Sequence, residues 1–301
     1  MDRQKIIVIV GPTGVGKTSL SIELAKKLNG EIISGDSMQV YRNMDIGTAK
    51  IREDEKEGIP HYLLDVQAYD EPFNVKTFQE QCRRAIEAIR QNGHVPIICG
   101  GTGLYLKATL YDYEFEDEQL DEQYDAYLKT KSNEQLYALL RQIDPGSCGT
   151  IHPNNRKRVI RALHIAHSGA TKSEREAVQK HEPLYDVFWI GLNTDRKKLN
   201  EQIDKRVDQM FEEGLTKEVE RLFSDPQTWE YTSFQGIGYK EFKNYFLKIW
   251  SEEEVREKIK VHTRQYAKRQ LTWFNHQMPV QWFDKKDTAL IIRKAEEWYN
   301  A

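Results

Sequence analysis

A chain of 301 residues, 39% hydrophobic and 30% charged, has the size and composition of a globular protein with one large or two smaller domains. No apolar run approaches the roughly 18 residues that a membrane-spanning helix needs, which excludes an integral membrane protein of that kind. The net charge of −3 excludes no polyanionic partner, because the charges are segregated: residues 112–125 carry eight acids and residues 155–161 carry four bases.

The cellular compartment is predicted from the N-terminus and the cysteines. The first residues enter a predicted strand at once, which leaves no room for a signal peptide. Cys82, Cys99 and Cys148 are far apart and form no CxxC pair. We therefore expect a cytoplasmic protein with reduced thiols, without a disulfide framework or a zinc site.

Strands and helices alternate over the first hundred residues. Apolar runs at 5–10, 31–34 and 95–101 predict strands, and the patterns at 19–28 and 78–92 predict amphipathic helices between them. This alternation predicts an α/β protein with a parallel sheet and helices on both faces.

A helical insertion interrupts this alternation. From Asp112 strand-like sequence disappears for about seventy residues, and the acidic stretch, residues 133–143 and residues 155–169 have helical character. We therefore expect an all-helical insertion at 115–183 within one α/β core that comprises residues 1–114 and 184–301.

The core resumes with two further predicted strands, at 185–193 and 280–284. Between them, apolar residues at helical spacing predict one long helix. Its buried face would be formed by Leu199, Ile203, Val207, Phe211, Leu215, Val219 and Leu222.

A glycine-rich motif, GPTGVGKT at 11–18, follows the first strand and opens a helix, as a phosphate-binding P-loop does. Backbone N–H groups of such a loop surround phosphate oxygens, and the helix N-terminus adds the positive end of its dipole. Lys17 adds a charge, and the Thr18 hydroxyl is placed to bind Mg²⁺. The motif predicts a P-loop NTPase-like core that binds a di- or triphosphate through Gly11, Thr13, Gly14, Val15, Gly16, Lys17 and Thr18.

The P-loop alone does not decide what is transferred. No Asn is followed by Lys, so the guanine-reading N-K-x-D motif of GTPases is absent, and only the late strand at 280–284 ends in an acid as a Walker-B strand does. A small-molecule kinase that uses Asp36 as its base, and an RNA-binding ATPase, both remain open at this point.

Six stretches resemble the bacterial tRNA dimethylallyltransferases in their order and spacing. They are GPTGVGKT (11–18), DSMQVYRNMDIGTAK (36–50), GGTGLYLKA (100–108), IHPNNRKRVIRAL (151–163), GIGYKE (236–241) and TRQYAKRQLTWF (263–274). The resemblance covers about residues 5–275. It implies transfer of a dimethylallyl group from dimethylallyl diphosphate to the exocyclic N6 amine of the adenosine on the 3′ side of the anticodon in tRNA, with release of diphosphate.

The resemblance also implies three catalytic residues. Asp36 would take a proton from the adenine amine as its nitrogen attacks C1 of the donor, a role for which general-base catalysis contributes about 10²–10⁴ in rate. Thr102 would contact the bridging oxygen of the diphosphate, and Arg206 would hold the same group. Mg²⁺ is the implied cofactor.

The tRNA contacts implied by the resemblance lie in several segments. The target base must leave the anticodon loop to react, and Asp36, Ser37, Met38 and Gln39 match the segment that receives it. Contacts with the anticodon stem-loop are implied for Lys157, Arg158, Val159, Ile160, Arg161, Gln235, Gly236, Ile237, Gly238, Tyr239 and Lys240.

A basic helical face and the tail complete the predictions. Lys260, Arg264 and Lys268 recur every four residues, so we expect them to line one helical face and contact RNA phosphates. The tail at 285–301 has no Cys or His, as in the bacterial form without a zinc finger. Tyr62 stands where the family has a second His after Pro60-His61. The sequence predicts a monomer, because nothing in it requires a larger assembly, and it predicts no membrane partner.

Overall fold

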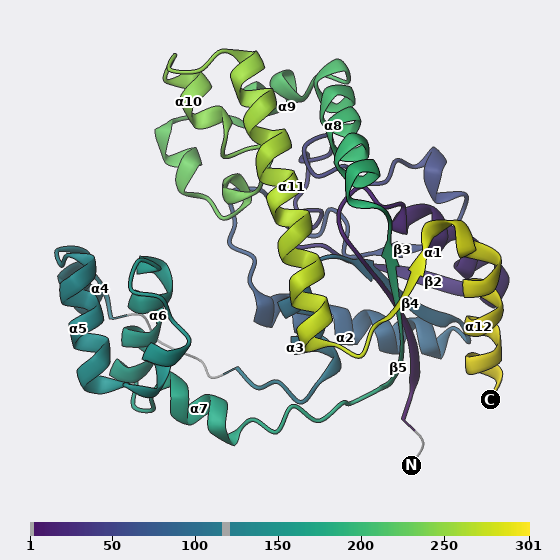
Figure 1. Ribbon diagram of the computed structural model, residues 1–301, viewed down its shortest axis with the longest axis horizontal. Coiled ribbons are helices and arrows are strands. Elements are labelled where there is room, and N and C mark those ends of the chain that lie inside the picture. The colour runs from purple at the N-terminus through teal and green to yellow at the C-terminus, as the bar shows by residue number, and fades with distance from the viewer. Residues whose placement is uncertain (1–2, 116–120) are drawn as a thin grey trace. The chain divides into compact units, whose positions relative to one another are not determined.

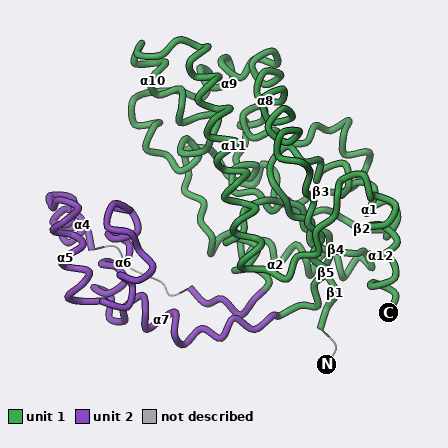
Figure 2. The backbone as a smooth tube through the Cα atoms, in the orientation of Figure 1, with its two compact units in different colours: residues 1–110, 184–301 green, residues 111–183 purple. Residues whose placement is uncertain are grey.

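The computed structural model describes residues 3–115 and 121–301. It divides into two compact units, one of residues 1–110 and 184–301 and the other of residues 111–183 (Figure 2). The second unit begins four residues before the predicted insertion at 115, because the N–H of Asp112 donates to the carbonyl of Glu182 at 3.0 Å and the N–H of Glu182 donates to Asp112 Oδ1 at 2.7 Å. These bonds join the two ends of the insertion.

The first unit contains a six-stranded, all-parallel sheet with the strand order β3-β2-β4-β1-β5-β6 (Figure 1). Its strands are β1 Lys5–Val10, β2 Gly30–Gly35, β3 His61–Tyr62, β4 Val95–Gly100, β5 Asp186–Asn193 and β6 Gln281–Asp284. The predicted parallel sheet is confirmed. The sequence did not predict β3, because two residues carry no recognisable pattern.

Helices cover both faces of this sheet, as predicted, with α1 and α12 on one face and α2 on the other (Figure 1). The helices of this unit are α1 Lys17–Leu28, α2 Val75–Gln91, α3 Gly103–Leu110, α8 Arg196–Glu212, α9 Leu215–Leu222, α10 Phe242–Phe246, α11 Glu252–Gln277 and α12 Thr288–Asn300. Short 3₁₀ turns lie at Asp54–Lys56, Pro226–Glu230, Ser233–Gln235 and Lys285–Asp287.

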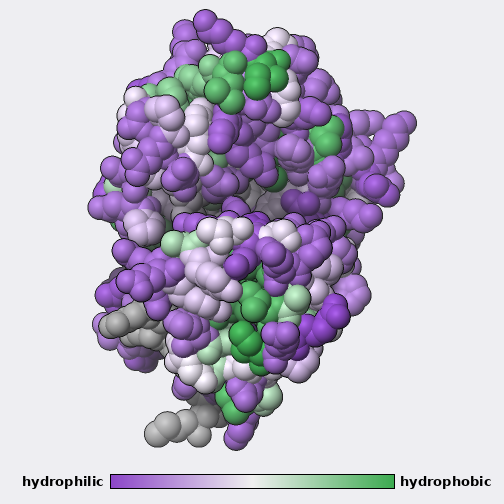
Figure 3. Space-filling view, turned by 90° about the vertical axis from the view of Figure 1, so that its left-hand side faces the viewer, coloured by the Kyte–Doolittle hydropathy of each residue, from purple (hydrophilic) through white to green (hydrophobic). Residues whose placement is uncertain are grey.

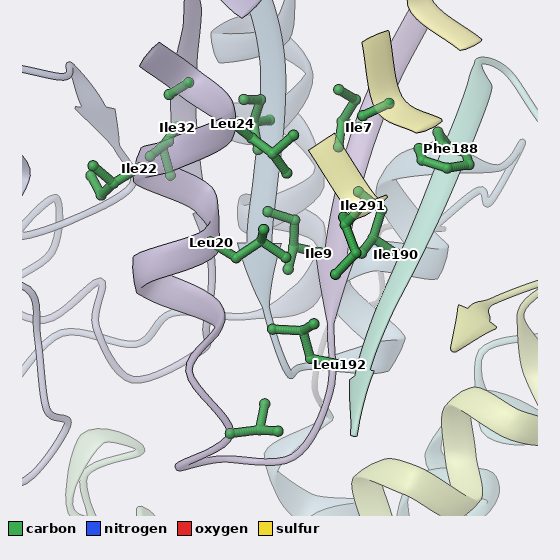
Figure 4. Close-up of a cluster of buried hydrophobic side chains, with 14 of the residues drawn as sticks. Ile7, Ile9, Leu20, Ile22, Leu24, Ile32, Phe188, Ile190, Leu192 and Ile291 are labelled. Carbon is green, nitrogen blue, oxygen red and sulfur yellow. The ribbon is translucent and has the colours of Figure 1, made fainter. Parts of the chain in front are cut away.

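The core of the first unit lies between the sheet and its helices. Alternate strand residues pack against α1 and α12, and Figure 4 shows Ile7, Ile9, Leu20, Ile22, Leu24, Ile32, Phe188, Ile190, Leu192 and Ile291 in this cluster. The intervening residues Ile6, Val8 and Val10 are also fully buried. Burial on both faces explains why these strands are continuous apolar runs.

The prediction of one long helix after β5 is wrong. Helix α8 ends at Glu212 and α9 begins at Leu215, with Gly214 between them at a φ of 99°. This left-handed conformation is tolerated by glycine and ends an α-helix. The predicted apolar face persists across the break, since Val207 and Val219 are both buried.

The second unit is helical between Asp121 and Val178. Its helices are α4 Glu122–Lys129, α5 Asn133–Ile143, α6 Arg156–His167 and α7 Lys172–Val178, with a 3₁₀ turn at Gly146–Gly149. Its core consists of Leu128, Leu136, Leu140, Ile151, Val159, Ala162 and Leu163. The acidic stretch 112–125 was predicted to be helical. Residues 112–115 form no helix, residues 116–120 lie outside the described residues, and α4 begins at Glu122.

The molecular surface is mostly hydrophilic on the face that Figure 3 presents, with hydrophobic residues in separate small groups. Exposed apolar side chains include Leu247 and Ile249, which follow α10. Over residues 3–115 and 121–301, no helix combines the length and apolar character that crossing a bilayer requires.

Candidate active site

Three loops meet at the carboxyl edge of the parallel sheet. Strand β1 leads into Gly11, β2 into Asp36 and β4 into Gly101, and β4 lies between β1 and β2. Gly35 and Gly100 are paired at the ends of their strands, and a Cβ on Gly100 would lie 2.2 Å from the Gly35 backbone. The absence of side chains here brings the loops together at the edge where open α/β sheets bind ligands.

The P-loop has the backbone that its glycines allow. Gly11, Gly14 and Gly16 have φ values of 144°, 83° and 101°, and α1 begins directly after them. Lys17 Nζ donates to the carbonyl oxygens of Gly11 and Pro12 at 3.0 Å each. Burial lowers the pKa of Lys17 to about 8. The Lys17 ammonium therefore lies inside the loop that is predicted to bind phosphate.

Two adjoining cavities lie at this edge, both within the first unit. The phosphate-loop cavity, of about 380 Å³, is lined by residues that include Gly14, Gly16, Lys17, Thr18 and His61. The second cavity, of about 350 Å³, is lined by residues that include Ser37, Met38, Ile203, Val207, Met210, Gln235, Gly236, Ile237, Lys240 and Ile259. Thr13, Asp36 and Arg206 line both cavities, which places them where the two spaces meet.

Asp36 and Thr102 are connected by hydrogen bonds to the backbone of Ser37 and Met38. Asp36 Oδ1 accepts the N–H of Met38 at 2.8 Å, and Thr102 Oγ1 accepts the N–H of Ser37 at 3.1 Å. The N–H of Thr102 donates to the carbonyl of Gly35 at 3.2 Å. The loop after β4 therefore holds the loop that carries Asp36.

Arg206 reaches the same place from α8. Its Nη1 lies 3.4 Å from Thr13 Oγ1 of the P-loop, to which it donates. Burial lowers the pKa of Arg206, and the negative charge of Asp36 opposes that change. The structure thus brings together the three residues whose catalytic roles the resemblance implied.

The side-chain amide of Gln39 is bonded within the chain. Its amide oxygen accepts the Ser34 hydroxyl at 2.9 Å, and its amide nitrogen donates to the carbonyls of Thr48 and Ala49 at 3.3 Å each. Gln39 lines the phosphate-loop cavity, whereas Met38 lines the second cavity. Both ends of the Gln39 amide therefore have partners within the chain, and its contact with a base stays a prediction.

The segment 235–240 divides into lining and supporting residues. Gln235, Gly236, Ile237 and Lys240 line the second cavity. Tyr239 is fully buried and its hydroxyl donates to Glu218 at 2.7 Å, while Gly238 has a φ of 98° and packs against Gly47. The folded chain covers the Tyr239 side chain, and the expected RNA contact of this residue stays a prediction.

Glu218 explains what Tyr239 does. Its buried carboxylate also accepts the N–H groups of Asp45, Ile46 and Gly47 at 2.8–3.1 Å. Since Gly47 lines the second cavity, the Glu218–Tyr239 pair holds one wall of that cavity in place. Sequence reasoning missed Glu218, which carries no motif of its own.

The basic face predicted on α11 is largely occupied by ion pairs. Lys260 Nζ lies 2.7 Å from Asp208 Oδ1, and Arg264 Nη1 lies 2.7 Å from both carboxylate oxygens of Asp204. These two side chains are paired with carboxylates of α8 that the spacing on α11 could not reveal, and their contacts with RNA phosphates stay predictions. Lys268 is exposed, and its RNA contact stays a prediction.

In the second unit, the segment 157–161 presents two kinds of side chain. Lys157, Arg158 and Arg161 are exposed on α6. Val159 is fully buried and Ile160 packs against the same core, and the RNA contacts expected for these two residues stay predictions. An amphipathic helix that exposes its bases must bury its apolar residues.

Tyr62 and two aromatic residues of α11 contact other residues of the first unit. The Tyr62 hydroxyl donates to the buried carboxylate of Glu31 at 2.6 Å, and that bond raises the pKa of Tyr62 to about 12. Phe274 is fully buried, and Trp273 lies against Gly103. These side chains therefore have structural contacts within the first unit.

Comparison with known proteins decides the family. A family model described as IPP transferase matches residues 39–277. The chain is 50% identical to a tRNA dimethylallyltransferase of Anoxybacillus flavithermus, over 98% of this chain and 94% of that protein. The chain belongs to the IPP transferase family. A second family member, from Bacillus cytotoxicus, is 51% identical over 98% of this chain and 96% of its own length.

Solved structures of family members have the same fold. A tRNA isopentenylpyrophosphate transferase from Staphylococcus epidermidis is 45% identical and covers 99% of both chains with a TM-score of 0.73. A eukaryotic dimethylallyltransferase acting on tRNA is 35% identical, with a TM-score of 0.81 over 93% of this chain and 74% of that one. The family resemblance and the predicted P-loop-like fold are confirmed.

Proposed function

We propose that this family member transfers the dimethylallyl group of dimethylallyl diphosphate to the N6 amine of the adenosine on the 3′ side of the tRNA anticodon. The observation that carries the proposal is the position of Asp36, which lines both cavities. A diphosphate held at the P-loop and a base held in the second cavity would meet at this carboxylate. The names of the relatives, tRNA dimethylallyltransferases, support the same reaction.

The P-loop would hold the diphosphate of the donor. Backbone N–H groups at the start of α1 and the Lys17 ammonium would bind its oxygens. Thr18 is exposed at the same helix start, and residues 3–115 and 121–301 contain no cluster of three or more His, Cys, Asp or Glu that could hold a metal unaided. The Thr18 hydroxyl would hold a Mg²⁺ ion, whose charge would stabilise the leaving group.

The chemistry forms a carbon–nitrogen bond and breaks a carbon–oxygen bond. The adenine amine is a poor nucleophile because its lone pair is delocalised into the ring. As N6 attacks C1 of the donor, Asp36 would accept the proton that nitrogen loses. The electron pair of the broken bond leaves on diphosphate, where Lys17, Arg206 and Thr102 would stabilise the growing negative charge.

The second cavity would receive the adenine after it leaves the anticodon loop. Met38 and Ile237 offer apolar contacts and Ser37 and Gln235 offer polar ones. Exposed bases at Lys157, Arg158, Arg161 and Lys268 would contact RNA phosphates without reading sequence. We propose that the protein does this as a cytoplasmic monomer.

Mass analysis of nucleosides tests the proposed function. Unmodified tRNA incubated with the protein, Mg²⁺ and dimethylallyl diphosphate should yield an adenosine heavier by one isopentenyl unit. A small-molecule kinase would consume ATP and leave the RNA unchanged, and an RNA-binding ATPase would hydrolyse ATP faster in the presence of RNA. Either result without a heavier nucleoside would overturn the proposal.

A further inference from the structure

The side-chain amide of Gln270 bridges two loops of the proposed diphosphate site. Gln270 lies on α11, far along the chain from both loops. Its Oε1 accepts the N–H of Thr13 at 3.0 Å, and its Nε2 donates to the carbonyl of Gly101 at 3.1 Å. Gln270 is 5% exposed, so its buried amide bonds to these two backbone groups in place of water.

The helix lies close against the loop that carries Thr102. A Cβ on Gly101 would lie 2.0 Å from Gln270 Nε2, and a Cβ on Gly103 would lie 2.2 Å from a ring carbon of Trp273. Because Gln270 and Trp273 are three residues apart, they share one face of α11. The two glycines that flank Thr102 therefore let one face of α11 pack against this loop both before and after Thr102.

Tyr266, one turn earlier on the same helix, continues this contact toward Asp36. Burial and the charge of Asp36 raise the pKa of Tyr266 to about 12, while hydrogen bonds with Thr102 and Gln270 act in the opposite direction. Tyr266 also lines both cavities. One face of α11 thus contacts the P-loop, the Thr102 loop and the surroundings of Asp36.

We propose that Gln270 is a positioning residue that sets the distance between the P-loop and Thr102, so that both can bind one diphosphate as it leaves. The inference rests on the proposed function. An amide suits this place because Thr13 requires an acceptor and Gly101 a donor. An ionised carboxylate only accepts and an apolar side chain does neither, whereas a protonated carboxyl group again supplies both.

The test compares Gln270→Met and Gln270→Glu in the full-length protein, by single-turnover rate and tRNA affinity between about pH 5.5 and pH 8.5. Gln270→Met should lower the transfer rate by roughly 10–100-fold, since small misplacements at a reacting centre cost about that much. Its tRNA affinity should change by less than about twofold. Gln270→Glu should be equally slow at high pH and recover relative to wild type as pH falls, because burial raises the pKa of a carboxyl group.

Controls separate positioning from folding. Gln277→Glu changes an exposed amide on the same helix and should leave the rate and its pH profile unchanged. If Gln270→Met does not fold, the pH dependence of the Gln270→Glu rate still tests the inference, because it is measured on a single folded protein. A wild-type rate in both variants, or no recovery in Gln270→Glu, would overturn the inference. Absence of transfer by the wild-type protein would instead overturn the proposed function.

Discussion

Three charged residues of the site act on one another although they come from separate parts of the chain. Asp36 follows β2, Lys17 begins α1 and Arg206 lies on α8. Burial is the largest effect and lowers the pKa of both Lys17 and Arg206. The charge of Arg206 lowers the pKa of Lys17 further, and the charge of Asp36 opposes the change in both bases. A ligand that carries several negative charges would balance these two half-buried bases.

Replacing Asp36 by Asn should lower the single-turnover rate of transfer by about 10²–10⁴, because Asn cannot accept the N6 proton. The Asn oxygen still accepts the N–H of Met38, so the loop should keep its conformation. Affinity for tRNA should change little, and a filter-binding measurement provides the control. Lost tRNA binding with normal chemistry would contradict the role of Asp36.

Binding of inorganic diphosphate should weaken as pH rises through about 8, where Lys17 loses its charge. The sign follows from the lowered pKa: the ammonium is present below about pH 8 and absent above it, and a bound anion favours the charged form. Diphosphate also ionises over this pH range. Measuring the diphosphate affinity of Lys17→Met at the same pH values separates that contribution from the contribution of Lys17. An affinity ratio between the two proteins that is constant with pH would count against this assignment.

At the scale of secondary-structure elements, two faces of α11 contact different parts of the site. One contacts the catalytic loops through Tyr266 and Gln270, and the other pairs with α8 through Lys260 and Arg264. A Ser251 capping box starts this 26-residue helix. The helix therefore connects the part of α8 that carries Arg206 with the P-loop and with Thr102.

Lys268 and Arg264 should respond differently to the same substitution. Lys268→Met should reduce the slope of log tRNA affinity against log salt by about 0.7–0.9, the effect of losing one phosphate contact. Arg264→Met should leave that slope unchanged and lower the unfolding free energy by about 0.5–1 kcal/mol, because Asp204 loses its partner. Salt titrations and urea unfolding measure the two effects. A reduced slope in Arg264→Met would instead support its expected RNA contact.

At the scale of the whole molecule, the chain leaves the first unit and returns at neighbouring points. The N–H of Leu184 donates to the carbonyl of Leu110 at 2.9 Å, so residues 111–183 form an insertion with adjacent ends. Each unit has a separate core. Such an arrangement indicates that the α/β unit does not require the insertion for its own packing.

Replacing residues 111–183 by a short Gly-Ser linker should leave diphosphate affinity within about threefold of wild type. Affinity for tRNA should fall by at least about tenfold, because the exposed bases of α6 are lost. The full-length Lys157→Ala/Arg158→Ala variant should reproduce part of that loss without deleting any structure. Failure of the deletion variant to bind diphosphate would contradict the independence of the two units.

Local pattern was sufficient for strands β1, β2, β4, β5 and β6 and for several of the helices. Strand β1 has the predicted bounds of 5–10 and α5 those of 133–143, because continuous apolar runs and helical periodicity reflect burial that each segment carries with it. The break at Gly214 was missed, since an apolar face that continues across a left-handed residue looks unbroken in sequence.

The sequence by itself determined the phosphate loop, the alternation of strands and helices, and the family, because these depend on short motifs and local periodicity. Only the tertiary structure decided which polar side chains are available to a ligand. Arg264, Gln39 and Tyr239 each bond to a partner within the chain, and Gln270 was placed between Thr13 and Gly101. Hydrogen-bond partners far apart in the chain are set by packing, which no local pattern records.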